Sequence, residues 1–307
     1  MADVNLKAQR YGKRKVRLVK VVRHANGRQE LAELTATVLL AGDFEASYTE
    51  ADNKKVVATD SIKNTVYVLA KKSTQVVPIE QFALTIAEHF LRTYDHVAQV
   101  WVELEQRPWD RMVINNQAHP HSFTQNKGWR RTTQLVATRK AGSEGTSAPW
   151  SVVIESGFHD LCVLKTTGSA FSGFVRDQYT TLSETNDRIL CTNVQNSWKL
   201  ASTDPRVLRM TDFDHLFDTS MAHTTRIFAD DNSVSVQATL YRIATATLRD
   251  CPAIAEASLA LPNIHIFGVD LAPFGLANTG ADLDVYKPVS DPSGLISATV
   301  QRAKARL

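Results

Sequence analysis

Residues 15–40 read KVRLVKVVRHANGRQELAELTATVLL, and this stretch decides the fold of the first half of the chain. Apolar and charged residues alternate over residues 15–21, and a second alternating run covers residues 33–40. A period of two is typical of a strand with one buried face. The polar stretch at 25–28 contains an Asn-Gly pair and joins the two runs, so the sequence predicts an antiparallel hairpin.

A helical pattern follows the hairpin. It begins at Pro78, because proline suits the first turn of a helix. An alternating run at 100–105 then predicts the next strand. The apolar residues of the helix recur at spacings of three and four, which is the period of an amphipathic helix, and they are Ile79, Phe82, Ala83, Ile86 and Phe90.

The second half of the chain repeats the order of strands, helices and strands. Because hairpins need no crossover connections, this order predicts an α+β fold in which helices cover one face of an antiparallel sheet in each half. The predicted strands are 151–155, 189–198, 255–261, 264–270 and 295–301, and the predicted helices are 220–228 and 234–248. The last of these helices should carry one shared face, made of Val234, Ala238, Tyr241 and Leu248.

Length and composition favour a globular chain of two domains. The 307 residues are about twice the length of a typical domain. Hydrophobic residues at 43% and charged residues at 22% argue against disorder. The segment 141–149 has the composition of a turn or linker. We therefore expect a first domain at 1–145 and a second at 146–307.

The same properties exclude several classes of partner. The net charge of +3 is spread along the chain, whereas nucleic-acid-binding proteins gather Lys and Arg on one face. No apolar run approaches the ~20 residues that cross a bilayer. The three cysteines are isolated, which favours a reducing compartment, and residues 1–11 lack the apolar block of a secretory signal. We expect a soluble intracellular protein without nucleic acid or membrane partners.

The C-terminal tripeptide Ala305-Arg306-Leu307 resembles the address that the peroxisomal import receptor reads. The alternative is a frayed basic tail, because Arg302, Lys304 and Arg306 alternate with small residues. A peroxisomal location and a cytoplasmic one, as in a bacterium, therefore both remain open.

Motifs for common cofactors are absent from the sequence. No two of the 13 glycines are separated by a single residue, so the dinucleotide motif G-x-G-x-x-G cannot be written, and there is no P-loop. His119-Pro120-His121 brings two imidazoles close together, but no third ligand lies nearby. A structural or substrate-channel role is favoured over a metal site there.

Two further segments carry polar residues in suggestive places. Residues 57–65 predict the start of a helix capped by Thr59 or Asp60, where free N–H groups favour an anion, although a simply capped helix explains the same pattern. Asn263 and His265 should share one face of a strand while Ile264 points to the core. A lone histidine in a strand is more often a structural residue, and the spacing alone does not favour a functional role.

Six segments together resemble the motifs of the urate oxidase family. They occur in the family's order from Tyr11 towards the C-terminus, which makes the resemblance specific. The segments are 11–13 (YGK), 57–65 (VATDSIKNT), 171–182 (FSGFVRDQYTTL), 187–190 (DRIL), 235–239 (SVQAT) and 261–265 (LPNIH).

The resemblance implies a fold, an assembly and a reaction. The fold would be two tandem tunnelling-fold domains, each an antiparallel sheet backed by helices. Subunits would form a barrel-like homotetramer with active sites at subunit interfaces. The enzyme would oxidise urate with O2 and water to 5-hydroxyisourate and release hydrogen peroxide, and it would use no metal and no cofactor.

The resemblance also implies roles for individual residues. Arg188 would hold the purine anion through a bidentate contact, and Gln237 would match an amide-like purine edge. Phe171 would stack on the ring, and Val236 would contribute through its backbone.

A second set of residues would handle protons and oxygen. Lys13, Thr59 and His265 are similar to the family's proton-handling triad, with Lys13 and Thr59 supplied by the neighbouring subunit. Asn263 and Thr59 would form the site for oxygen and water, and Asp60 would join Thr59 among the substrate contacts.

The chain departs from the family's pattern at three positions, Asn193, Ile264 and Ala305. Two alternatives to urate oxidation stay open at this point. One is another purine or pterin enzyme of the same fold, and the other is a silent urate-binding paralogue. Isolated cysteines argue against the zinc-dependent members of the first class, and intact Lys13, Thr59 and His265 argue against the second.

Overall fold

A computed structural model describes residues 4–140, 142, 145 and 149–303 of the chain. The C-terminal tripeptide 305–307 lies outside the described residues. The helices and strands, in chain order, are β1 (Tyr11–Arg23), β2 (Gln29–Gly42), α1 (Glu45–Thr49), α2 (Thr59–Lys72), α3 (Ile79–Thr93), β3 (Val97–Arg107), β4 (Asp110–Ile114), β5 (Gln117–Thr124), β6 (Arg130–Arg139), β7 (Trp150–Lys165), β8 (Leu190–Leu200), α4 (Pro205–Arg209), α5 (Phe213–Asp230), α6 (Val236–Asp250), β9 (Ile254–Gly268), β10 (Tyr286–Val289) and β11 (Leu295–Gln301).

The chain divides into two compact units. The first unit combines Met1–Phe158 with Lys199–Asp214, and the second combines His159–Trp198 with His215–Leu307. The domain boundary expected after residue 145 stays a prediction, because residues 146–148 lie outside the described residues.

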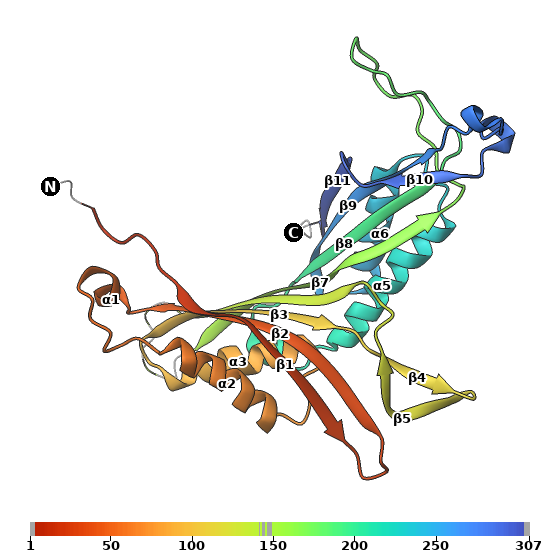
Figure 1. The fold of residues 1–307 in the computed structure, drawn as a ribbon. Helices are drawn as coiled ribbons and strands as arrows, with labels where there is room; N and C mark the ends of the chain where they lie inside the picture. The colour runs from red at the N-terminus through yellow and green to blue at the C-terminus, as the bar shows by residue number, and fades with distance from the viewer. Residues whose placement is uncertain (1–3, 141, 143–144, 146–148, 304–307) are drawn as a thin grey trace. The chain divides into compact units, whose positions relative to one another are not determined.

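The first unit is built on the predicted hairpin. β1 and β2 pair antiparallel, with Tyr11 opposite Leu40 and Arg23 opposite Gln29. The sheet continues in the order β1-β2-β3-β6-β7, and α2 and α3 lie on one of its faces (Figure 1). In β2 the alternating residues 34, 36, 38 and 40 are at most 1% exposed. The apolar residues that recur every second position therefore form the buried face of this strand.

The predicted amphipathic helix is α3, and it forms the centre of the first unit's core. Its five predicted apolar residues are all at most 2% exposed. Pro78 is the N-cap residue, one position before the first helical residue. The helix packs against β3 and β6 of the sheet. The spacing of apolar residues therefore identified both the helix and its buried face.

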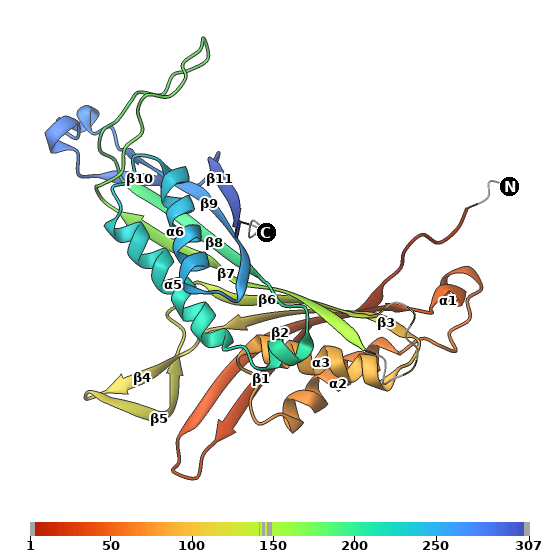
Figure 2. The ribbon, with the colours of Figure 1, turned by 180° about the vertical axis from the view of Figure 1, so that it is seen from behind.

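The second unit repeats this arrangement with the second part of β7 and the strands that follow it. β7, β8, β9 and β10 lie side by side, and β11 also pairs with β9. α5 and α6 run next to each other on one face of these strands (Figure 2). Asn196 of β8 donates to the hydroxyls of Ser220 and Thr224 on α5, at 3.2 and 3.0 Å, so this core includes a buried polar contact.

Two predictions for the second unit were wrong in detail. Val234 precedes α6 and is 58% exposed, and Tyr241 is 59% exposed, so neither belongs to the buried face. Ser235 caps the helix and starts it at Val236. The buried face therefore begins at Val236 and mixes aliphatic residues with alanine and threonine; it includes Val236, Leu240, Ile243, Ala244 and Thr247.

The two strands predicted at 255–261 and 264–270 are one continuous strand, β9. Pro262 suggested a break, but it sits where β9 changes partner. β11 pairs with Glu256–Pro262 and β10 pairs with His265–Gly268. A residue without an N–H is tolerated at such a junction. Ile264, which was expected to face the core, is only partly buried.

The predicted α+β class with a large antiparallel sheet is confirmed. Among the described residues, no helix combines the length and apolar character needed to cross a membrane. Cys162 is exposed and Cys191 and Cys251 are buried, and all three are free thiols.

A buried ion pair stabilises the first unit. Glu80, in the first turn of α3, is 1% exposed, and its carboxylate lies 2.9 Å from Arg131 of β6. Arg131 also pairs with Asp214 at 2.5 Å. Removing one carboxylate from a buried ion pair is costly, because the remaining guanidinium loses part of the compensation for its desolvation.

Replacing Glu80 by Ala should therefore lower the free energy of unfolding by about 3 kcal/mol or more, as measured by urea denaturation. The matched control is Arg92→Ala, which removes an exposed pair with Glu88 on the same helix. That control should cost less than about 1 kcal/mol. Equal losses in the two variants would contradict the importance of the buried pair.

Candidate functional site

Three segments far apart in the chain are hydrogen-bonded to one another in the second unit. The Ser233 N–H donates to the Gly168 carbonyl at 2.8 Å, and the Ala170 N–H donates to the Ser233 carbonyl at 3.0 Å. The Arg188 N–H donates to the Ser169 carbonyl at 2.8 Å. We call the joined segments the three-segment scaffold, which comprises residues 168–171, 185–188 and 231–237.

Arg188 and Phe171 come together on this scaffold. The guanidinium carbon of Arg188 lies 5.3 Å from the centroid of the Phe171 ring. Phe171 also stacks on Phe174, with 4.7 Å between centroids and 10° between ring planes. Burial lowers the pKa of Arg188, and its Nε is buried without a hydrogen-bond partner. An unused guanidinium donor beside an aromatic face suits a flat anion.

Asp187 fixes the turn that presents Arg188. Its carboxylate accepts from the Thr167 hydroxyl at 2.7 Å and from the Gly168 N–H at 3.0 Å. These hydrogen bonds, with that from Thr167 the largest, hold the pKa of Asp187 below its usual range. The sequence analysis gave Asp187 no role, although it lies in a quoted motif next to Arg188.

The start of α6 forms the third part of the scaffold. The Ser235 hydroxyl caps the helix by accepting from the Ala238 N–H, and it donates to Oε1 of Gln237 at 3.1 Å. Val236 is buried and Gln237 is exposed. Phe171, Arg188, Val236 and Gln237 therefore all belong to one hydrogen-bonded assembly, as a shared binding site requires.

Lys165 of β7 holds the segment that leads into α6. Its Nζ donates to the Asp231 carbonyl at 2.6 Å and to the Ser233 hydroxyl at 2.8 Å. The Asp231 carboxylate accepts from Thr239 at 2.6 Å and forms an ion pair with Arg242, both on α6. Burial lowers the pKa of Lys165, and the nearby Asp231 partly opposes this shift.

Asn263 and His265 lie on β9 at the place where this strand changes partner. The Asn263 N–H donates to the Gly294 carbonyl at 2.8 Å. Its side-chain Oδ1 is buried and has no hydrogen-bond partner. His265 is opposite Val289 of β10, and its ring stacks on Phe267 at 5.7 Å. A buried acceptor without a partner indicates a place for a water molecule or a ligand.

Lys13 lies in the first unit, next to a β-bulge. The pairing of β1 with β2 shifts register between Lys13 and Val16. At Gly12 the two backbones approach so closely that a Cβ would lie 2.0 Å from the Val38 carbonyl oxygen. A bulge redirects the side chains around it, so Gly12 and the bulge together set the direction of Lys13.

Thr59 and Asp60 form the first turn of α2, and the predicted cap was wrong. The N-cap residue is Ala58, with no side-chain hydrogen bond, and Thr59 is the first helical residue. Asp60 turns along the helix to Lys63, at 2.6 Å, and to Asn64, at 2.9 Å. The helix thus begins without a side-chain cap, which leaves N–H groups available to an anion.

The first unit also brings Lys13 near this helix start. The Lys63 hydrogen bond is the largest cause that lowers the pKa of Asp60, and the charge of Lys13 contributes in the same direction. The side chains of Thr59 and Asp60 are exposed. The predicted residues therefore form one group in the first unit, consisting of Lys13, Thr59 and Asp60.

His119 and His121 lie on β5, which pairs with β4 in a separate two-stranded sheet. Their ring centroids are 4.6 Å apart. Across the part of the chain that the structure describes, no three His, Cys, Asp or Glu side chains are grouped to hold a metal ion.

Comparisons with known proteins agree on one family. The family model described as Uricase matches residues 9–136 and 154–297. A uricase from Aspergillus flavus is 41% identical over 98% of both chains. The crystal structure of a uricase from Arthrobacter globiformis superposes with a TM-score of 0.85 at 39% identity, covering 100% of this chain and 98% of that one.

Replacing Asp187 by Ala should loosen the turn that presents Arg188. We expect hydrogen exchange of the backbone amides at 168–171 and 187–190 to become about tenfold faster. Asp177→Ala is the matched control, because the Asp177 carboxylate also accepts from a backbone N–H, that of Tyr179, and from the Thr180 hydroxyl, both within its own loop. Acidification should act like Asp187→Ala. The pKa of Asp187 is lowered in the folded protein, so its contribution is lost as pH falls through that lowered value. Unchanged exchange in Asp187→Ala would contradict this role.

Proposed function

The chain belongs to the uricase family and is an enzyme that oxidises urate; we propose that it converts urate, O2 and water to 5-hydroxyisourate and hydrogen peroxide without a cofactor. In this reaction two electrons pass from the purine to O2, which becomes peroxide. Water supplies the hydroxyl oxygen, so atoms and charge balance. A deprotonated purine is electron-rich enough to reduce oxygen directly.

The observation that carries the proposal is the pairing of Arg188 with Phe171 on the three-segment scaffold, 5.3 Å apart. Arg188 offers a planar fork of donors for the anionic edge of urate. Gln237 offers a donor and an acceptor for an amide-like edge, and Val236 its backbone. The Phe174 ring stacks on Phe171. In the proposed complex the purine ring would replace Phe174 in this stack.

The group in the first unit supports the proton-transfer part of the proposal. Lys13 would remove a proton from the substrate through the Thr59 hydroxyl, and His265 would complete the relay. Asp60, beside Thr59, would contact the substrate's edge. The unsatisfied Oδ1 of Asn263 is the acceptor that a water molecule above the ring needs.

The assembly proposed with this function is a homotetramer of tandem tunnelling-fold domains. Lys13 and Thr59 would reach the purine-binding group of a neighbouring subunit. Thr59 is exposed at an uncapped helix start, so it can contact a second chain. A particle mass close to that of one chain would contradict this assembly.

The purified protein should consume urate and O2 and release hydrogen peroxide in equal amounts. The loss of urate absorbance, an oxygen electrode and a peroxide assay measure the three quantities. A strong chelator should leave the rate unchanged if no metal takes part. Rapid turnover that the chelator abolishes would overturn the cofactor-free reaction, and the absence of turnover would overturn urate oxidation itself.

Two substitutions should separate binding from chemistry. Arg188→Ala should raise KM by about tenfold or more, because it removes a charged contact to the substrate. Lys13→Met should lower kcat by about a hundredfold with little change in KM, because it removes a base. Arg226→Ala, at an exposed position of α5, is the control for both. Full turnover in Lys13→Met would show that Lys13 is not the base.

A further inference from the structure

A hydrogen bond connects the strand that carries Lys13 with the segment that leads into the helix start at Thr59. The hydroxyl of Tyr11 accepts from the Val57 N–H at 2.7 Å. Tyr11 precedes Lys13 by two residues, and Val57 precedes Thr59 by two residues. The bond therefore joins the backbone two residues before each of the two functional side chains.

The Tyr11 side chain is itself held in place. Its ring packs edge-on against Phe44, with centroids 4.9 Å apart, and Phe44 is 1% exposed. Burial, the largest cause, raises the pKa of Tyr11 above its usual value, so its hydroxyl stays neutral in the physiological range. The acceptor for the Val57 N–H is thus fixed by packing.

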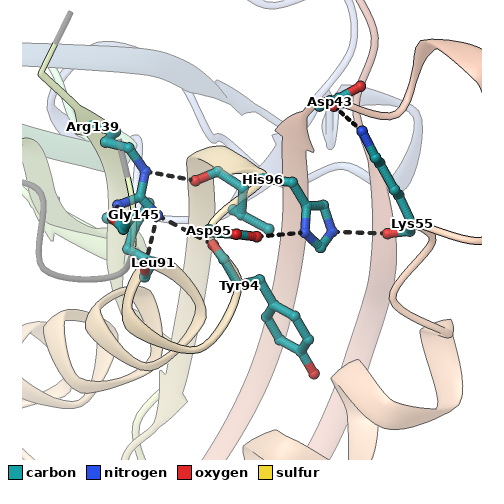
Figure 3. Close-up of polar contacts among 9 residues, drawn as sticks. Asp43, Lys55, Leu91, Tyr94, Asp95, His96, Arg139 and Gly145 are labelled. Carbon is teal, nitrogen blue, oxygen red and sulfur yellow. Dashed lines mark hydrogen bonds and ion pairs between the residues drawn. The ribbon is translucent and has the colours of Figure 1, made fainter. Parts of the chain in front are cut away.

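The segment between β2 and α2, residues 43–58, is also held by hydrogen bonds to His96 (Figure 3). Nε2 of His96 donates to the Lys55 carbonyl at 2.8 Å, and Lys55 forms an ion pair with Asp43 across the loop. The Asp43 N–H donates to the His96 carbonyl at 2.9 Å. At Gly42 a Cβ would lie 2.0 Å from that carbonyl oxygen, so the close approach requires glycine.

Arg139 of β6 fixes the turn that carries His96. Its guanidinium is buried and donates to the carbonyls of Leu91, Tyr94 and Val97 at 2.6, 3.1 and 3.1 Å (Figure 3). These hydrogen bonds from β6 therefore fix the turn between α3 and β3. The segment 43–58 is therefore hydrogen-bonded to this turn at Lys55 and to Tyr11 at Val57.

We infer that Tyr11 is a positioning residue, which sets the separation of Lys13 and Thr59 through its hydrogen bond to the Val57 N–H. This inference rests on the proposed function, in which those two side chains pass a proton between them. Proton transfer needs heavy atoms within about 2.6–3.2 Å. A displacement of about 1 Å can reduce a rate by about a hundredfold. The backbone tie at Tyr11 prevents such a displacement.

The decisive variant is Tyr11→Phe, which keeps the ring against Phe44 and removes only the acceptor. We expect kcat for urate oxidation to fall by about 10- to 100-fold, with KM within about twofold of wild type. Tyr67→Phe is the matched control. The Tyr67 hydroxyl also joins α2 to β1, by donating to the Arg17 carbonyl at 3.3 Å, but it lies away from the helix start. Its kcat should stay unchanged.

Hydrogen exchange of residues 56–62 gives a readout that does not depend on activity. Tyr11→Phe should accelerate exchange there, and Tyr67→Phe should not. Accelerated exchange with a wild-type kcat would overturn the positioning role, and so would equal losses of kcat in the two variants. If the wild-type protein failed to oxidise urate, the proposed function would fall. The inference would then be judged by exchange alone, and unchanged exchange in Tyr11→Phe would overturn it.

Discussion

Backbone hydrogen bonds between three distant segments are the constraint on which the candidate site depends. Ser233 exchanges bonds with Gly168 and Ala170, and Ser169 accepts from Arg188. No helix or strand supplies this arrangement, because these residues lie between the regular elements. The side chains of Phe171, Arg188 and Gln237 share one place only because main-chain groups that loops usually expose to water are paired with one another.

Hydrogen bonds from charged side chains, together with aromatic packing, hold both groups of functional residues. Lys165 holds the segment before α6 in the second unit, and Arg139 holds the turn before β3 in the first. Arg139 donates to several carbonyl oxygens, and Lys165 donates to one carbonyl oxygen and one hydroxyl. A cationic side chain that donates to backbone carbonyls can order a loop of any sequence, since every residue offers a carbonyl.

The sequence predicted the elements with strong periods and missed those without one. The β1–β2 hairpin and α3 followed from uninterrupted alternation and from five apolar residues at helical spacing. The face of α6 was misjudged because Thr and Ala line its buried stripe, and β9 was split because Pro262 is harmless at a change of partner. The residues proposed for urate came from resemblance to a family. Tyr11 and Asp187 lie in quoted motifs but were given no role, and Arg139 was not singled out, because the roles of all three depend on contacts between residues remote in sequence.

The candidate residues are divided between two units, and each unit holds its own residues through internal contacts. Lys13 and Thr59 are fixed by contacts within the first unit, and Phe171 and Arg188 by contacts within the second. In the proposed assembly, each chain would carry Lys13 and Thr59 in one unit and the purine-binding residues together with His265 in the other, before it meets another copy. A mixed population of chains, some damaged in one unit and some in the other, would contain pairings in which two intact units meet. If the proposed assembly forms, a defect in one unit would be complemented by the intact copy of that unit in a neighbouring subunit.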